Sequence, residues 1–138
     1  MKHPEEVKLE FTREWVRKAE CDYQTAILLL DSGERFASAV TFHAQQSVEK
    51  YIKAFLVWHQ IEFKKTHDIA LHLKTAAEAA PDIEEKLTEA HELTPYGVEY
   101  RYPGDYPDVT FMDAQRAVNL ANLVRAEIRH RLPHEALE

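Results

Sequence analysis

The chain has 138 residues, enough for one domain with a real hydrophobic core and cramped for two. Its 17 Lys and Arg residues against 24 Asp and Glu residues give a formal net charge of −7. Broad, non-specific binding of duplex DNA needs a basic surface, so the charge argues against that class of protein. Hydrophobic residues make up 45% and charged residues 30%, as in ordinary globular proteins. We therefore expect a single domain spanning residues 1–138.

Glycine and cysteine are both scarce, with three glycines and one cysteine in the chain. So few glycines disfavour the many tight turns of a β-sandwich or barrel and favour a helical protein. The lone Cys21 permits no internal disulfide and no cysteine-rich metal site. No segment approaches the ~18 apolar residues of a membrane span, and the first residues lack the apolar run of a signal peptide. The sequence predicts a cytoplasmic protein with no metal and no cofactor.

In chain order, the first two expected helices cover residues 12–30 and 35–60, because apolar residues recur there at helical spacing. Gly33 stands where the C-cap of the first helix belongs, so the two helices form a hairpin with a short connection. The apolar side of the first helix consists of Trp15, Ala19, Tyr23, Ala26, Ile27 and Leu30. That of the second consists of Val40, Ala44, Val48, Tyr51, Ile52, Phe55 and Leu56.

Three further helices are expected after residue 60. One begins at residue 66 or 67, one covers 81–93, and the last covers 110–131, where Thr110 and Asp113 have the spacing of a capping box. No run of β-branched residues is long enough for a strand. The pattern predicts an all-α, up-and-down bundle of about five helices, the first two of which are the longest and pack antiparallel. The residues expected in its core include Val48, Tyr51, Ile52 and Phe55.

Residues 96–107 are unusual, since they hold four of the six tyrosines, two prolines, two glycines and one arginine. Proline fixes φ, so we expect this loop to be rigid. Arg101, between Tyr100 and Tyr102, has the chemistry to pair with a phosphate while a tyrosine ring stacks on a base. Two other interpretations stay open: the tyrosines, including Tyr96, bury their rings across the bundle, or they form a dimer contact.

Two further segments carry polar groups where a ligand would bind. His43 and Lys50 project from one rim of the apolar stripe of the second expected helix. They either line a cleft between helices or are a hydrogen-bonded histidine and a snorkelling lysine. Lys65 and His67 lie at the N-terminus of the next expected helix, which suits an anion, whereas capping by His67 or Asp68 is the plainer interpretation.

Three stretches of the chain resemble the signature of the HEPN family. They are AVTFHAQQSVEKYIKAFL (39–56), KTHDI (65–69) and YRYP (100–103), and they occur in the family's order. The resemblance covers nearly the whole chain and implies an up-and-down helical bundle that usually forms a two-fold dimer. Members are small prokaryotic proteins, often encoded beside or fused to a minimal nucleotidyltransferase in toxin–antitoxin-like systems. Some members are toxins that cut RNA without a metal, and others have been proposed to bind nucleotides.

The chain departs from the pattern of HEPN nucleases. These carry an arginine, four to six further residues and then a histidine near the start of the last helix. Arg101 stands at a comparable place, but positions 106 to 108 are Tyr, Pro and Asp. The spacing does occur at Arg125–His130 and Arg129–His134, at the far end of the last helix. Residues five apart on a helix point about 140° apart, so we do not assign a nuclease site to these pairs.

Three functions follow from the residues and the resemblance. The favoured one is a dimeric HEPN-like binding module that contacts a nucleotide or RNA, a nucleotidyltransferase partner, or both. The first alternative is a metal-independent ribonuclease toxin, in which Arg101 stabilises the scissile phosphate and His43 or His67 acts as acid or base. The second is a purely structural helical partner subunit. The acidic charge and the missing Arg–His pair favour the binding module.

The predicted site is a cleft beside the 96–107 loop. The residues expected to approach one another there are Arg101, Tyr102, His43, Lys50 and His67. Contacts to a nucleotide or its phosphate are assigned to Arg101, Tyr102, Lys50, Lys65 and Tyr96. The candidates for catalysis are Arg101, His43 and His67.

Overall fold

The computed structural model of the chain describes residues 2–98, 104 and 107–138. Within these residues it contains helices and no strand, which confirms the all-α prediction. The α-helices are α1 (Pro4–Asp31), α2 (Ala37–Trp58), α3 (Ile69–Ala76), α4 (Ile83–Leu87) and α5 (Phe111–Arg131). Short 3₁₀ segments are η1 (Glu34–Phe36), η2 (Thr88–Gly97) and η4 (His134–Leu137). None of the described helices combines the length and apolar character that crossing a membrane requires.

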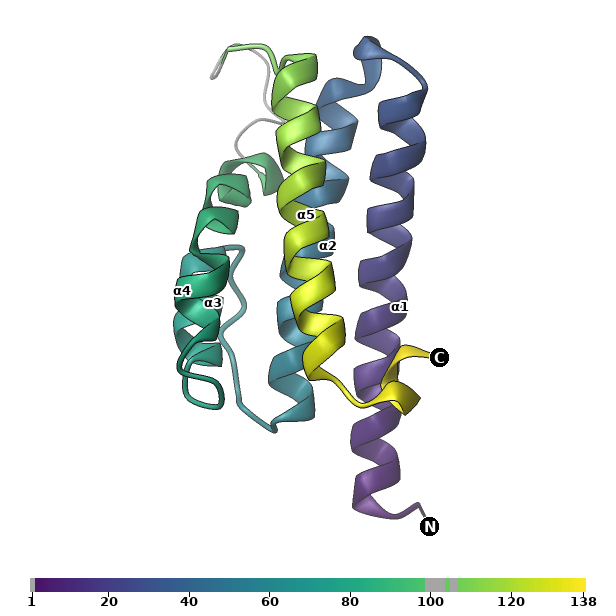
Figure 1. Cartoon of the computed structure of the whole chain (residues 1–138), viewed down its shortest axis with the longest axis vertical. Coiled ribbons are helices and arrows are strands. Elements are labelled where there is room, and N and C mark those ends of the chain that lie inside the picture. The colour runs from purple at the N-terminus through teal and green to yellow at the C-terminus, as the bar shows by residue number, and fades with distance from the viewer. Residues whose placement is uncertain (1, 99–103, 105–106) are drawn as a thin grey trace.

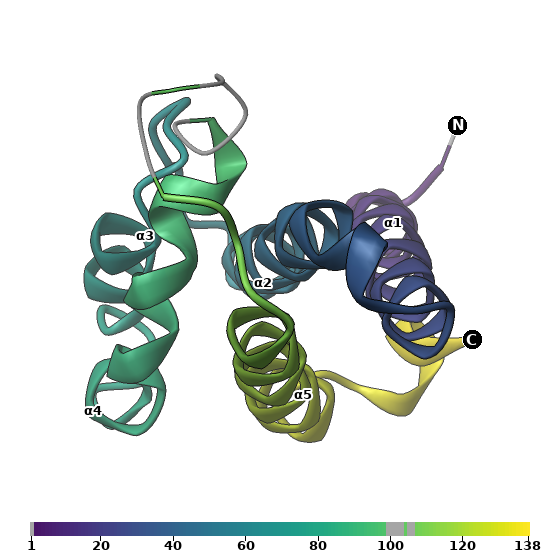
Figure 2. The same ribbon diagram turned by 90° about the horizontal axis from the view of Figure 1, so that it is seen from above.

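Helix α2 lies in the middle of the bundle (Figure 2), with α1 and α5 against it and α3, α4 and η2 forming an arm on another side. Helices α1 and α2 run antiparallel, as the sequence predicts (Figure 1). Helix α5 also runs antiparallel to α1, because Tyr23 bonds Asn122 and the earlier Glu20 bonds the later Arg125. Helices α2 and α5 are therefore parallel, and the arm between them carries the chain back.

The core is built on α2. The apolar stripe predicted for this helix is buried along its whole length, and Val48, Tyr51, Ile52 and Phe55 are each at most 1% exposed. On α1, Ala19, Tyr23 and Ala26 are buried against α2, whereas Trp15, Ile27 and Leu30 are half-buried at the border of the core. Burial of this stripe from every side explains why α2 holds its neighbours together.

The first helix starts at Pro4, well before the predicted residue 12. Proline breaks a helix when it lies in the interior. At the first position of a helix, however, proline is favourable, since the N–H that it lacks would have no partner there. His3 completes the cap, because its Nδ1 accepts a hydrogen bond of 3.2 Å from the N–H of Glu5. Glu5 and Glu6 in the first turn also favour the positive end of the helix dipole.

The start of α5 agrees with the prediction, whereas the helix predicted over residues 81–93 ends early. Thr110 and Asp113 form the predicted capping box at the start of α5, with both reciprocal bonds present. The predicted helix over 81–93 is α-helical only to Leu87 and continues as the 3₁₀ segment η2. That segment contains Pro95, which lacks the N–H that a continuing α-helix requires.

The carboxylate of Glu20 joins the three long helices. The Tyr51 hydroxyl donates to it from α2, and Arg125 of α5 donates to both of its oxygens at 2.6 and 2.9 Å. Burial alone would raise the pKa of Glu20, but the hydrogen bonds from Arg125 and Tyr51 outweigh burial and lower it to about 2. Burial and the bond to Glu20 raise the pKa of Tyr51 to about 12. The cluster therefore keeps its charges over a wide range of pH.

Phe55→Ala should lower the free energy of unfolding by about 3–5 kcal/mol, because its ring is fully buried and truncation leaves a cavity. Phe11 on α1 is 55% exposed and provides a matched control, so Phe11→Ala should cost less than about 1 kcal/mol. Urea unfolding followed by circular dichroism measures both values. Equal, small losses in the two variants would contradict the packing of α2.

Glu20→Gln should destabilise the protein by about 1.5–3 kcal/mol at pH 7, since it removes the charge that Arg125 pairs with. The pKa of Glu20 is depressed in the folded state, so its stabilising effect is complete above about pH 5 and disappears as the pH falls toward 2. The difference between wild type and variant in urea unfolding should shrink over that interval. Glu14→Gln, at an exposed position of the same helix, is the control; a pH-independent difference for Glu20→Gln would argue against the ion pair.

Candidate functional site

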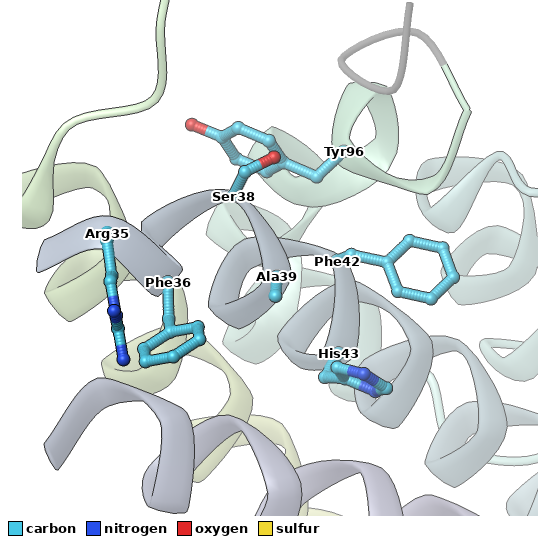
Figure 3. A pocket seen from close by; sticks show the side chains of 7 residues that line it. All are labelled: Arg35, Phe36, Ser38, Ala39, Phe42, His43 and Tyr96. Carbon is cyan, nitrogen blue, oxygen red and sulfur yellow. The ribbon is translucent and has the colours of Figure 1, made fainter. Parts of the chain in front are cut away.

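A cavity of about 440 Å³ opens where the start of α2 faces η2. Its volume falls within the range of about 300–1,000 Å³ that is usual for small-molecule sites. The lining side chains come from two parts of the chain that are far apart in sequence (Figure 3). Segment η1 and helix α2 supply Arg35, Phe36, Ser38, Ala39, Phe42 and His43, and η2 supplies Tyr96.

The chemistry of the lining is cationic and aromatic. Among the described residues that line the cavity, Arg35 is the one with a formal charge, and its guanidinium lies 4.7 Å from the centre of the Phe36 ring. Phe42 meets His43 edge to face, with 5.3 Å between the ring centres. Arginine binds phosphate through a planar fork of donors, and aromatic faces stack on nucleobases. Ser38 adds a hydroxyl that both donates and accepts hydrogen bonds.

One carboxylate on α1 fixes the wall of the cavity. Asp22 bonds His43 at 2.9 Å through one oxygen and Lys50 at 2.5 Å through the other. The Asp22 side chain is mostly buried, so the two contacts are shielded from solvent. His43 and Lys50, which project from the same rim of α2, thus share one partner. The lysine offsets the charge of Asp22, while the ring of His43 lines the cavity.

Tyr96 reaches the cavity because η2 approaches α2 unusually closely at the next residue. A Cβ at Gly97 would lie 2.9 Å from the side-chain amide of Gln45, so position 97 has no room for a side chain. Thr94 ties η2 to the start of α3 through a 3.2 Å bond from the N–H of Ile69 to its hydroxyl. Tyr96 therefore lies between a contact of η2 with α3 and a close approach of η2 to α2.

A second polar cluster lies on another part of α2, around Glu49. This carboxylate is buried and accepts from Lys53 at 2.7 Å, from Gln45 at 2.7 Å and from His67 at 2.9 Å. Burial alone would raise the pKa of Glu49, but these hydrogen bonds keep its pKa below the ordinary value.

Asp68 caps α3 by accepting a hydrogen bond from the N–H of Leu71, which is the plainer of the two interpretations of the segment around Lys65 and His67.

The structure therefore divides the residues of the predicted site. His43 and Tyr96 line one cavity, and Lys50 is bound to the same carboxylate as His43. His67 pairs with Glu49 and does not line the cavity, and neither does the exposed Lys65. Arg101 and Tyr102 lie outside the described residues, so their place at the site stays a prediction. No group of three metal-ligating side chains gathers within the part of the chain that the structure describes.

Several contributors to this site were not predicted from the sequence. Arg35 and Phe36 belong to the turn between the first two helices, and Phe42 was passed over beside His43. A signal was available, because Phe36 and Phe42 are aromatic residues outside the apolar stripe of α2. Asp22 had no comparable signal, since only the tertiary packing of α1 against α2 brings it to His43.

Comparisons with known proteins agree with this architecture. A family model described as the HEPN domain matches residues 12–131. The crystal structure of ST0689, an archaeal HEPN homologue, superimposes on the chain with a TM-score of 0.70 at 24% sequence identity. The match covers 87% of this chain and 96% of that one, and it shows a shared fold. No curated protein matches the sequence significantly.

Proposed function

The chain belongs to the HEPN domain family, and from this premise we propose that it is a dimeric, non-catalytic binding module that holds a nucleotide at the start of α2. The observation that carries the proposal is the cavity lined by Arg35, His43 and three aromatic rings, with no acidic side chain among the described residues that line it. HEPN domains often dimerise. A nucleotidyltransferase partner stays a proposal that rests on the resemblance to the family alone.

The arrangement suits a nucleotide, either free or at the end of an RNA strand. The guanidinium of Arg35 provides a bidentate partner for a phosphate. The rings of Phe36, Phe42 and Tyr96 provide faces for a base, and the hydroxyl of Ser38 and the imidazole of His43 provide hydrogen bonds to its edge or to the ribose. In the sequence prediction, Arg101 adds a second phosphate ligand and Tyr102 another ring.

Arg35→Ala should weaken binding of adenosine monophosphate at least about tenfold, since it removes the positive charge from the lining of the cavity. Isothermal titration calorimetry at constant ionic strength measures the effect. Arg116→Ala is the matched control, because Arg116 is exposed, pairs with Glu92 and lines none of the described cavities. Arg101→Ala in the same series tests the sequence prediction.

No heat of binding by the wild type at millimolar nucleotide would remove the proposal. An affinity that stays the same in Arg35→Ala would place the nucleotide elsewhere on the protein. Loss of affinity in Arg116→Ala as well as in Arg35→Ala would indicate that surface arginines attract the nucleotide non-specifically and that it has no defined binding site.

The Asp22–His43 pair favours one second candidate, a metal-independent ribonuclease. A carboxylate at 2.9 Å from Nδ1 orients the imidazole, which then has the geometry of a general acid or base in the cavity that Arg35 also lines. Under this alternative, RNA should be cut in the presence of excess EDTA, and His43→Ala should abolish the cleavage while His67→Ala leaves it intact. Persistent cleavage in His43→Ala would exclude this histidine, and the absence of cleavage by the wild type favours the binding module.

A further inference from the structure

The arginines that have no acidic partner all line cavities. Of the arginines that the structure describes, four pair with a carboxylate: Arg13, Arg116, Arg125 and Arg131. Within the same part of the chain, Arg17, Arg35 and Arg129 form no ion pair, although the chain has 24 acidic residues. Arg35 lines the cavity proposed for a nucleotide, which we call the Arg35 cavity. Arg17 and Arg129 line a second cavity, which we call the Arg129 cavity.

The Arg129 cavity has a volume of about 320 Å³ and lies between α1 and α5. The Glu20–Arg125 pair sets the antiparallel register of these two helices. One helical turn further along α5, Arg129 comes level with Val16 and Arg17 of α1. The third side is the segment that contains η4, which folds back against α1 (Figure 1). Three separate parts of the chain therefore enclose the two guanidiniums.

Both guanidiniums keep donors for a ligand. Arg129 is half-buried, and one of its nitrogens donates to the Tyr51 hydroxyl at 3.3 Å. This bond holds the Arg129 side chain in place, and a guanidinium has five N–H donors, so most of them remain. Arg17 is exposed and makes no hydrogen bond to a described residue. Two guanidiniums that share a cavity and lack acidic partners are arranged to bind an oxyanion.

Two carboxylates that also line the cavity limit the charge of this anion. Glu20 accepts four hydrogen bonds, two of them from Arg125, so its charge is largely offset. Glu138 has the guanidinium of Arg13 at 3.9 Å. Both carboxylates would repel the double charge of a phosphate more strongly than the single charge of a carboxylate. The balance of charge therefore favours a carboxylate ligand.

The uncharged part of the lining differs from that of the Arg35 cavity. Apart from Gln24 it is apolar and consists of Val16, Cys21 and Leu137. None of the described residues that line the Arg129 cavity is aromatic, so they offer no ring face on which a base stacks. Val16 is buried and Leu137 packs against the core, so a short aliphatic chain lying on them leaves water for an apolar surface.

We propose that the Arg129 cavity is a second binding site, separate from the Arg35 cavity, and that its ligand is a small aliphatic carboxylate. The carboxylate lies between the guanidiniums of Arg17 and Arg129, and the aliphatic chain lies against Val16 and Leu137. A planar guanidinium pairs with a planar carboxylate through two parallel hydrogen bonds. For a ligand of about eight non-hydrogen atoms, we expect a dissociation constant on the order of 1 mM.

Titration of the ¹⁵N-labelled full chain with sodium hexanoate at constant ionic strength, followed by two-dimensional NMR, tests the proposal. Saturable shifts should centre on residues 16–24 and 137–138, while residues 35–43 stay unchanged. Hexanamide has the same size and no charge, so it should bind at least about tenfold more weakly. Arg17→Gln should weaken hexanoate binding at least about fivefold, because it removes one guanidinium from the site.

Lys18→Gln is the matched control, because Lys18 is the next exposed residue of α1 and does not line the cavity. It removes the same charge and should leave hexanoate binding unchanged. Circular dichroism should show both variants folded like the wild type, since Arg17 has no partner to lose. Arg17→Gln should also bind adenosine monophosphate like the wild type, so nucleotide binding in the Arg35 cavity keeps its own test.

The absence of saturable shifts at about 20 mM hexanoate overturns the proposal. Equal affinities for hexanoate and hexanamide, equal weakening in the two variants, or shifts centred on residues 35–43 overturn it as well. Weakening that is confined to Arg17→Gln, together with weaker binding of hexanamide, supports it.

Discussion

Two carboxylates on one turn of α1 hold the three long helices in place. Glu20 and Asp22 lie about 160° apart around the helix, so they flank the buried stripe that contains Tyr23 on its two sides. Glu20 accepts hydrogen bonds from Tyr51 and Arg125 on one side, and Asp22 pairs with Lys50 and His43 of α2 on the other. Each carboxylate is satisfied by more than one partner, which is the condition for partly buried charge to be tolerated.

The candidate site depends on this arrangement. Because Asp22 fixes His43, the start of α2 presents a defined wall to the cavity instead of a mobile imidazole. The opposite wall depends on Gly97, whose missing side chain lets η2 approach Gln45 and brings Tyr96 to the same space. Preorganised walls reduce the conformational entropy that a ligand must overcome, so a small cavity of this kind is suited to specific binding.

The sequence predicted features that lie within one helix, but it did not predict contacts between residues far apart in the chain. The period of the apolar residues predicted α2 and its burial, and Thr110 with Asp113 predicted the start of α5, because both signals lie within one element. Asp22 meets His43 across 21 residues of chain, and Glu20 meets Arg125 across 105, so neither contact follows from local spacing. The predicted site was drawn around the later loop, whereas the described cavity is centred on the turn before α2.

The most direct test of the account is where a nucleotide perturbs the backbone. Titration of uniformly ¹⁵N-labelled protein with adenosine monophosphate, followed by two-dimensional NMR, measures the chemical-shift change of each backbone amide in one experiment. The account predicts saturable shifts concentrated on residues 35–43 and on Tyr96, with those of α3 and the first half of α1 unchanged. Shifts centred on residues 64–68, or none at millimolar nucleotide, would contradict it.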